Sequence, residues 1–287
     1  MTKPIEPSHS RPKASSIGLT VDEIVGSVPK PTTEYPKMSN QEPAKAVVKT
    51  MKLLEALSDG SSLGVTELAR RVSMHKSTVH RFMTTLCELG YARQDQDERY
   101  AATLKMLGLG TSVAQSLQFW RPAVEVMQWL SMETRETIHL AALDGLKFVY
   151  VHKIESTQLL RVSMLSRIGD TGPFHCTGVG KILLAWQPPS GRKAIIEENP
   201  LTRFTENTIT TVEQLETELE EVRRTGVSTD DEEHELGVRC LAVPVWREEG
   251  QSVIGARTIS APSIRMERKQ RPDYEKLLRR ASQDVAV

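Results

Sequence analysis

The sequence is poor in the features that mark secreted, disulfide-bonded or membrane-spanning proteins. Its three cysteines are widely separated and form no C-x-x-C motif, which argues against a disulfide framework and a cysteine-rich metal site. No apolar run approaches the ~18 residues of a membrane-spanning helix. The first residues also lack the apolar segment of a secretory signal. We therefore expect a soluble cytoplasmic protein.

The whole chain carries no excess of either charge. Thirty-seven Lys and Arg residues balance 37 Asp and Glu residues among 287, so the overall charge gives no sign of nucleic acid or an anionic membrane as a partner. Binding depends on local patches, however, and an even balance excludes neither partner. With 39% hydrophobic residues the chain can bury a core, and its length is typical of two domains or of one large domain.

Proline is concentrated at the start of the chain. Seven of the 15 prolines lie in residues 1–43, among scattered Ser and Thr residues and with little apolar periodicity. Such a segment cannot bury enough surface to offset the entropy lost on ordering. We predict a disordered tail over residues 1–43.

The next segment, residues 44–103, carries the pattern of a winged helix-turn-helix. A first amphipathic helix ends at the run SDGSS, residues 58–62. A short second helix is expected with Thr66 as its N-cap, and a third helix ends near Gly90. Two short strands flank a polar run and predict a β-hairpin, the wing. The apolar residues predicted to face the core are Val47, Val48, Met51, Leu53, Leu54 and Leu57 on the first helix and Val79, Phe82, Met83, Leu86 and Leu89 on the third.

The rest of the chain mixes helices with strands. A helix over residues 104–117 should link it to the first domain, and Pro122 should lie in the first turn of the next helix. Asp144-Gly145 predicts a hairpin between two strands. Because hairpins interleave with helices, we expect an α+β fold with an antiparallel or mixed sheet flanked by helices. The expected strands are 137–143, 147–154, 159–164, 240–246 and 252–260, and the expected helices are 181–187, one from the Thr211 capping box to Gly226, and a polar C-terminal helix.

The third helix of the first domain is the candidate DNA-reading element. Its side opposite Val79 carries only hydrogen-bond donors, which suit phosphate oxygens and base edges. From Thr66 to Arg81 there are four Lys or Arg residues and one acid, a local positive charge in a neutral chain. The alternative is a solvated helix face, which normally mixes acids with bases. The residues predicted to contact DNA are Lys76, Ser77, Thr78, His80, Arg81 and Thr85 on the helix and Arg93 in the hairpin.

A series of short motifs runs through the chain. They are VTELARR at 65–71, KSTVHR at 76–81, LGY at 89–91, ETIHL at 136–140, VYVHKI at 149–154, SRIG at 166–169, GVGK at 178–181 and DDEEHELGVRC at 230–240. Together they resemble the IclR family of bacterial transcription regulators, over about residues 44–270, and the last motif is highly specific to that family. The middle segments most resemble the branch that includes the regulator of 2-keto-3-deoxygluconate metabolism.

This resemblance implies a fold and a mode of action. It implies a GAF-like effector domain after the winged helix, and a homodimer or a tetramer (a dimer of dimers) bound to a palindromic DNA operator. It also implies control by a small organic acid, here a sugar-derived keto acid. The expected segments are the tail at 1–43, the winged helix-turn-helix at 44–103, the linker helix at 104–121 and the effector domain at 122–287.

Three features could converge on a small anion. GVG at 178–180 precedes a helix, whose N–H groups and dipole favour a carboxylate. The run at 230–240 supplies polar groups, and Thr258 and Ser260 alternate along a strand so that both face one side. Each feature also has a structural interpretation. In that interpretation GVG only forms a turn, Cys240 is a small core residue, and Thr258 and Ser260 lie on a solvent-exposed face. By resemblance, the effector-binding residues are Gly178, Val179, Asp230, Cys240, Thr258 and Ser260.

The last strand departs from the family pattern, most of all at Arg257. That strand usually reads close to LSISGP and here reads RTISAP, which places Arg257 on the face opposite Thr258. Nothing in the family pattern explains the arginine.

Enzymes are the main rival class. The histidines and cysteines show no H-x-x-x-H or C-x-x-C spacing, and His139 and His152 are expected to pack on the sheet or to make hydrogen bonds. The acidic run at 213–221 is interpreted as a solvated helix face. We expect no catalytic residue, no metal and no cofactor. The favoured function is a ligand-responsive transcriptional repressor, and the alternative is an effector-binding module that acts through protein partners.

Overall fold

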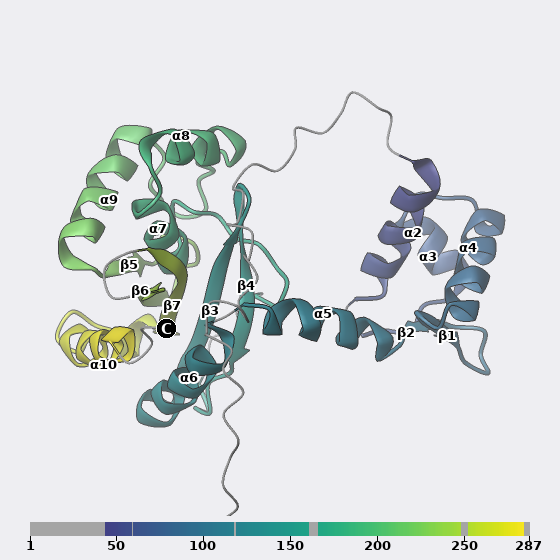
Figure 1. Ribbon diagram of the computed structural model, residues 1–287, viewed down its shortest axis with the longest axis horizontal. Coiled ribbons are helices and arrows are strands. Elements are labelled where there is room, and N and C mark those ends of the chain that lie inside the picture. The colour runs from purple at the N-terminus through teal and green to yellow at the C-terminus, as the bar shows by residue number, and fades with distance from the viewer. Residues whose placement is uncertain (1–43, 59, 118, 161–165, 248–251, 284–287) are drawn as a thin grey trace, which may run out of the picture. The chain divides into compact units, whose positions relative to one another are not determined.

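The computed structural model describes residues 44–58, 60–117, 119–160, 166–247 and 252–283. The tail predicted to be disordered, residues 1–43, lies outside these residues. The described chain contains a small helical domain, a connecting helix and a larger α+β domain (Figure 1).

The small domain is the predicted winged helix-turn-helix. Its helices α2 (Lys45–Ala56), α3 (Val65–Arg71) and α4 (Lys76–Glu88) pack around an apolar core, and β1 (Ala92–Gln94) pairs antiparallel with β2 (Tyr100–Ala102). Gly90 has a φ of +75°, the left-handed conformation expected just beyond the end of α4. Core residues that are at most 3% exposed include Leu53, Leu68, Val79, Met83, Leu86 and Tyr100.

Three details of this domain differ from the sequence prediction. The N-cap of α3 is Gly64, so the predicted cap at Thr66 is wrong and Thr66 lies inside the helix. Leu89 is 54% exposed, because it follows the last turn of α4 and does not face the core. The core contacts only the C-terminal half of α2, so the predicted apolar positions Val47, Val48 and Met51 are exposed.

Helix α5 (Lys105–Gln115) is the predicted linker helix. None of its residues is buried, and Leu107, Leu109 and Val113 are each more than half exposed. The next helix, α6 (Trp120–Thr134), carries Pro122 in its first turn as predicted, where a missing N–H costs no intrahelical hydrogen bond.

The larger domain is built on a five-stranded sheet in the order β4-β3-β7-β6-β5. All neighbouring strands are antiparallel, and the hairpin predicted at Asp144-Gly145 joins β3 to β4. The strands are β3 (Thr137–Asp144), β4 (Lys147–Ile154), β5 (Ser228–Asp231), β6 (Val238–Trp246) and β7 (Val253–Pro262).

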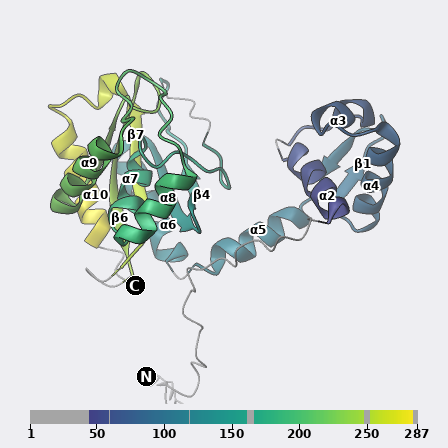
Figure 2. The ribbon, with the colours of Figure 1, turned by 90° about the horizontal axis from the view of Figure 1, so that it is seen from above.

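Helices cover both faces of this sheet (Figures 1 and 2). α6 and α10 (Arg271–Gln283) pack on one face against residues such as Ile138 and Ile259. α7 (Gly178–Ala185), α8 (Pro189–Glu198) and α9 (Val212–Thr225) pack on the other face. Because side chains alternate along a strand, β7 directs Arg257 to the α10 face and Thr258 to the α7 face. Arg257 is fully buried, and its Nη1 donates to the carbonyl oxygen of Ala281 over 2.9 Å.

The prediction for this domain was incomplete in four places. The edge strand β5 is only four residues long, and α8 begins with Pro and Gly, so neither gave a clear periodic signal. α7 starts at Gly178, three residues earlier than predicted, because Thr177 is the N-cap. Leu159 and Leu160 form no strand, and residues 161–164 of that predicted strand lie outside the described part. Among the described helices, none has the length and apolar character to cross a membrane.

Candidate functional site

The exposed face of α4 carries the residues predicted to contact DNA. Lys76, Ser77, His80, Arg81 and Thr85 are exposed, whereas Thr78 is half-buried. The opposite face buries Val79, Met83 and Leu86 against the domain core, so these polar side chains share one surface. The hydroxyl of Thr85 donates to the carbonyl of Arg81 over 3.2 Å, so it must leave that bond before it can donate elsewhere.

Only one of two arginines at the base of the hairpin is exposed. Arg99 is tied inward, since its Nη2 lies 3.2 Å from a carboxylate oxygen of Glu67 and its Nε donates to the carbonyl of Ser62 over 3.1 Å. Arg93, predicted to contact DNA, is exposed on β1. At the tip, Asp95 accepts hydrogen bonds from the backbone of Asp97 and Arg99 and closes the turn.

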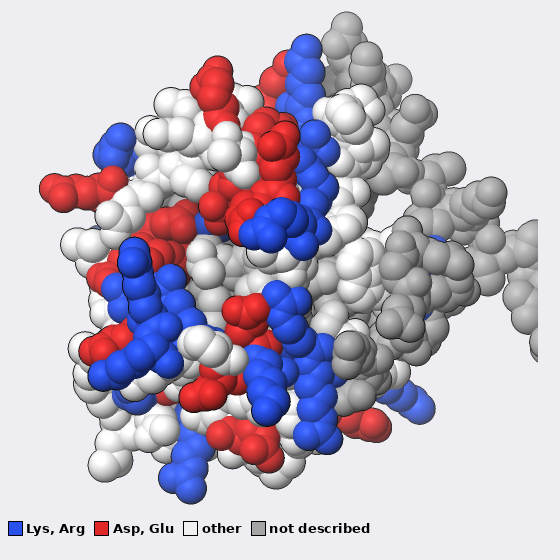
Figure 3. Space-filling view, turned by 90° about the vertical axis from the view of Figure 1, so that its left-hand side faces the viewer, with Lys and Arg blue, Asp and Glu red and all other residues white. Residues whose placement is uncertain are grey.

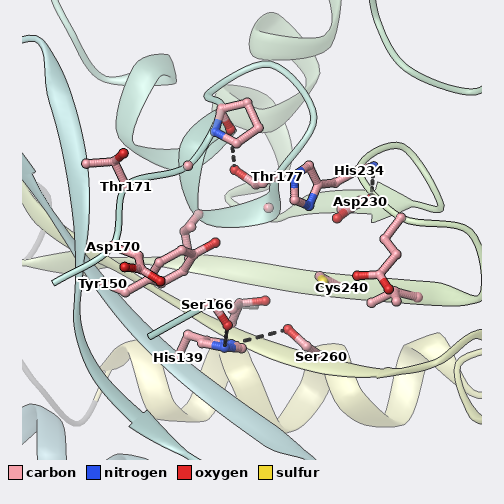
Figure 4. A pocket seen from close by; sticks show the side chains of 17 residues that line it. His139, Tyr150, Ser166, Asp170, Thr171, Thr177, Asp230, His234, Cys240 and Ser260 are labelled. Carbon is pink, nitrogen blue, oxygen red and sulfur yellow. Dashed lines mark hydrogen bonds between the residues drawn. The ribbon is translucent and has the colours of Figure 1, made fainter. Parts of the chain in front are cut away.

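A cavity of about 340 Å³ lies in the larger domain between the start of α7 and the sheet (Figure 4). All six residues predicted to bind an effector line it: Gly178, Val179, Asp230, Cys240, Thr258 and Ser260. His234 and Glu235, from the polar run at 230–240, also line it. Residues that the sequence did not single out for this site line it as well, and they include His139, Tyr150, Ser166, Asp170, Thr171 and Thr177. Its size suits a small ligand.

The first turn of α7 opens onto this cavity. The Thr177 hydroxyl donates to the carbonyl of Pro173 over 2.7 Å and accepts from the N–H of Gly180 over 3.2 Å. The N–H groups of Gly178 and Val179 lie in the first turn of α7, where the helix has no carbonyl to accept their hydrogen bonds. They are therefore suited to bind an anion. Gly180 allows the close packing, since a Cβ there would lie 2.6 Å from the Cα of Phe174. The helix N-terminus is therefore fixed rigidly beside the cavity.

Asp230 brings a carboxyl group to the same end of the cavity. Its Oδ1 accepts from the N–H of Glu233 over 2.9 Å. Burial, and then the negative charge of Glu233, raise the pKa of Asp230 to about 7. Near neutral pH this carboxyl is thus partly protonated, and the protonated form can donate a hydrogen bond to an acidic ligand.

His139 is the main cavity residue whose role sequence reasoning missed. The sequence predicts that it packs on the sheet or makes hydrogen bonds, and it does both: it lies on β3 in register with Thr258. In addition its Nε2 lies 2.8 Å from the Oγ of Ser166 and its Nδ1 lies 3.4 Å from the Oγ of Ser260. Burial, with a smaller effect from Lys153, lowers the pKa of His139 to about 3, so the ring is neutral. The sequence signal that could have indicated this role is a polar histidine within the apolar segment TIHLAAL, residues 137–143.

Two of the residues predicted to bind the effector can offer a ligand only limited hydrogen bonding. The Thr258 hydroxyl donates to the carbonyl of Leu241 over 2.8 Å, so it can only accept from a ligand. Cys240 remains a thiol, because burial and the nearby Asp230 raise its pKa. It is a weak donor and acceptor.

A buried ion-pair cluster lies behind the cavity. Lys181 on α7 is fully buried, and its Nζ lies 2.7 Å from Glu233 Oε1 and 3.1 Å from Glu218 Oε1. Burial opposes the lysine charge, but the carboxylates of Glu233 and Glu218 outweigh it and raise the pKa of Lys181. The interpretation of residues 213–221 as a purely solvated face is thus wrong for Glu218. Within the described residues, no group of three or more His, Cys, Asp or Glu side chains could hold a metal ion.

Comparisons with known proteins cover both parts of the chain. The family model for the bacterial transcriptional regulator IclR C-terminal domain matches residues 111–287, and that for the IclR helix-turn-helix domain matches residues 46–96. The HTH-type transcriptional regulator KdgR of Escherichia coli (strain K12) is 42% identical over 243 residues, which are 84% of this chain and 91% of that protein.

Solved structures of related regulators are also similar to this chain. The crystal structure of IclR from Thermotoga maritima has a TM-score of 0.72 and 27% identity, over 83% of this chain and 96% of that one. The C-terminal domain of E. coli KdgR has a TM-score of 0.52 and 39% identity, over 58% of this chain and 96% of that one.

Proposed function

Because this chain belongs to the IclR family of bacterial transcriptional regulators, we propose that a small organic acid, bound in the cavity beside α7, controls its binding to DNA. The chain is a DNA-binding regulator similar to the repressor KdgR and is not an enzyme. The proposal concerns the residues that contact DNA and effector, the class of effector and the assembly. We also propose that the protein, as a regulator of transcription, acts in the cytoplasm.

In the proposed complex α4 enters the major groove. Lys76, Arg81 and His80 supply donors for base edges and phosphates, and Ser77, Thr78 and Thr85 approach the backbone. Arg93 adds a phosphate contact from the hairpin. The protein acts as a homodimer or a dimer of dimers on a palindromic operator, with half-sites about one helical turn, or a multiple of it, apart. The functional division remains 44–103 for DNA, 104–121 for the linker and 122–287 for the effector.

The effector is proposed to be a sugar-derived keto acid. Its carboxylate accepts from the N–H groups of Gly178 and Val179 and from protonated Asp230, while Thr258, Ser260 and Cys240 contact the rest of the molecule. A single observation carries this proposal: the six residues come from α7, β5, β6 and β7, and they line one cavity at a helix N-terminus. The acid controls transcription if it binds one of two protein states more tightly, which shifts the balance between them.

The test combines operator selection with ligand binding. Full-length protein selects fragments from a genomic library, and fluorescence anisotropy compares the selected fragment with random duplex at moderate salt. We expect clear preference for the selected fragment, and a change of its affinity on addition of 2-keto-3-deoxygluconate but not of aromatic acids. Absence of any effect of sugar-derived acids, in anisotropy and in calorimetry, would overturn the proposed effector class.

A further inference from the structure

We infer that Ser166, His139 and Ser260 form a hydrogen-bonded row that binds hydroxyl groups of the effector, so that the cavity selects a polyhydroxylated acid over an unsubstituted one. The inference rests on the proposed function and adds the residues that determine specificity. Of these three residues only Ser260 was assigned to the site from the sequence.

The row lies across the cavity from the proposed carboxylate site. Figure 4 shows His139 between the two serines on the sheet side, with Thr177, the N-cap of α7, on the opposite side. The ring nitrogens of His139 lie 2.8 Å and 3.4 Å from the hydroxyl oxygens of Ser166 and Ser260. A ligand whose carboxylate meets α7 therefore points its other end towards this row.

The chemistry of a neutral imidazole decides what the row can bind. Such a ring has one N–H donor and one acceptor nitrogen, so one serine accepts from it and the other donates to it. The serine that accepts keeps its own O–H free to donate, and the other keeps lone pairs free to accept. Cys240 also lies within hydrogen-bonding reach of Ser260, but a thiol is a weak partner. The row thus offers one donor and one acceptor, which matches hydroxyl groups, since each of them both donates and accepts.

The charge that lines this end of the cavity favours neutral groups, since the nearby Lys153 is paired with Glu155 over 2.7 Å and does not line the cavity. His139 carries no positive charge near neutral pH. Asp170 also lines the cavity and is labelled in Figure 4 beside Tyr150. A carboxylate can accept from ligand hydroxyls, but it repels a second carboxylate on the ligand. The cavity therefore suits a monocarboxylate with a hydroxylated tail.

The segment that carries Ser166 is held in place by hydrogen bonds to β4. Lys153 donates from Nζ to the carbonyl of Ser166 over 3.0 Å. The N–H of Gly169 donates to the carbonyl of Tyr150 over 2.8 Å, and the N–H of Tyr150 donates to the carbonyl of Asp170 over 2.9 Å. Ser166 is thus positioned before a ligand arrives, which lowers the entropic cost of binding.

Calorimetry on the full-length protein tests the inference with two matched acids. 2-keto-3-deoxygluconate and 2-oxohexanoate share a six-carbon chain and a 2-keto carboxylate, and only the first carries hydroxyls. We expect the wild type to prefer the hydroxylated acid by about 10- to 100-fold, the value of one or two hydrogen bonds. Ser166→Ala should lower affinity for that acid about tenfold and leave 2-oxohexanoate within about twofold of wild type.

Two further variants make the outcome decisive. His139→Phe keeps a ring of similar size, removes both nitrogens and should abolish the preference, while Ser166→Ala remains informative if that variant fails to fold. Ser282→Ala is the matched control, because it removes a half-buried hydroxyl bonded to Pro244 on the α10 face. Equal affinity of the wild type for both acids, or an unchanged preference in Ser166→Ala, overturns this inference alone. Binding of neither acid overturns the proposed effector class as well.

Discussion

At the scale of single residues, Asp230 sets how an acidic ligand responds to pH. Its carboxyl lies at the end of the cavity that α7 closes, with His234 beside it and Glu233 and Lys181 behind it. Burial and the charge of Glu233 raise its pKa to about 7. Below that pH the group is neutral and can donate a hydrogen bond. Above it, two negative charges would face each other.

Effector binding should therefore weaken as pH rises. If the ligand carboxylate binds only when Asp230 is protonated and donates to it, the competent fraction falls about tenfold between pH 6 and pH 8, and the apparent affinity falls with it. Calorimetry with 2-keto-3-deoxygluconate at the two pH values measures this. Asp230→Asn donates at every pH and should flatten the profile. A profile that stays as steep in Asp230→Asn would assign the effect to another group, such as His234.

The common location of the six predicted residues in one cavity could be predicted by motif, and the place of His139 in that cavity could not. Gly178, Asp230 and Cys240 belong to segments that resemble a known family, so their common location followed once the strands were placed. His139 contacts the cavity only because β3 pairs with β7 in the register that sets it opposite Thr258. Strand register depends on tertiary packing, and a lone histidine in an apolar strand reads equally well as a core residue.

At the scale of elements, α7 is anchored by charge inside the domain. Its Lys181 is buried and reaches both α9, through Glu218, and the segment after β5, through Glu233. The second carboxylate oxygen of Glu233 has no hydrogen-bond partner in the described part of the chain. Removal of the lysine would leave two carboxylates close together with no compensating cation.

Lys181→Met should therefore destabilise the domain strongly. Loss of one partner from a buried ion pair costs about 3–5 kcal/mol, and urea unfolding followed by circular dichroism would measure it. The control is Lys193→Met on α8, where an exposed lysine lies 3.8 Å from Glu197. An exposed pair of this kind contributes about 0–1 kcal/mol. Similar losses in the two variants would contradict a structural role for the buried cluster.

Most elements could be predicted because their ends carry local signals. Gly226 ends α9 in a left-handed conformation, and Thr211 caps its start, both as the sequence indicated. β5 was missed because it gains its pairing from β6 and carries two aspartates that have low strand propensity. The start of α7 was misplaced because GVG suggests a turn, whereas close packing against Phe174 admits glycine within the helix.

At the scale of the whole molecule, positive and negative side chains are equal in number. Figure 3 shows positive and negative side chains interspersed on one face, without a surface of a single sign. The matches to the two family models cover residues 46–96 and 111–287 separately. DNA contacts and effector contacts are therefore expected to respond to different substitutions.

Arg81→Ala should weaken operator binding and spare effector binding. Loss of one arginine that contacts a base or phosphate costs about 1–3 kcal/mol of binding free energy, measured by anisotropy on the selected fragment.

Ser260→Ala should have the opposite effect. It should weaken the response to the effector and leave the affinity for DNA unchanged when no effector is present. Arg268→Ala, an exposed arginine of the larger domain, is the control for loss of charge. Parallel loss of both activities in Arg81→Ala would argue against separable sites.

The complete burial of α7 also determines how slowly its backbone amides exchange with deuterated water. All eight of its residues are buried, so exchange there requires opening of the surrounding domain and not fraying at a surface. Deuterium uptake along α7 thus measures the opening free energy of that domain. Occupation of its first turn by a ligand would slow the amides of Gly178 and Val179 beyond their neighbours, which gives a label-free reading of where an acid has docked.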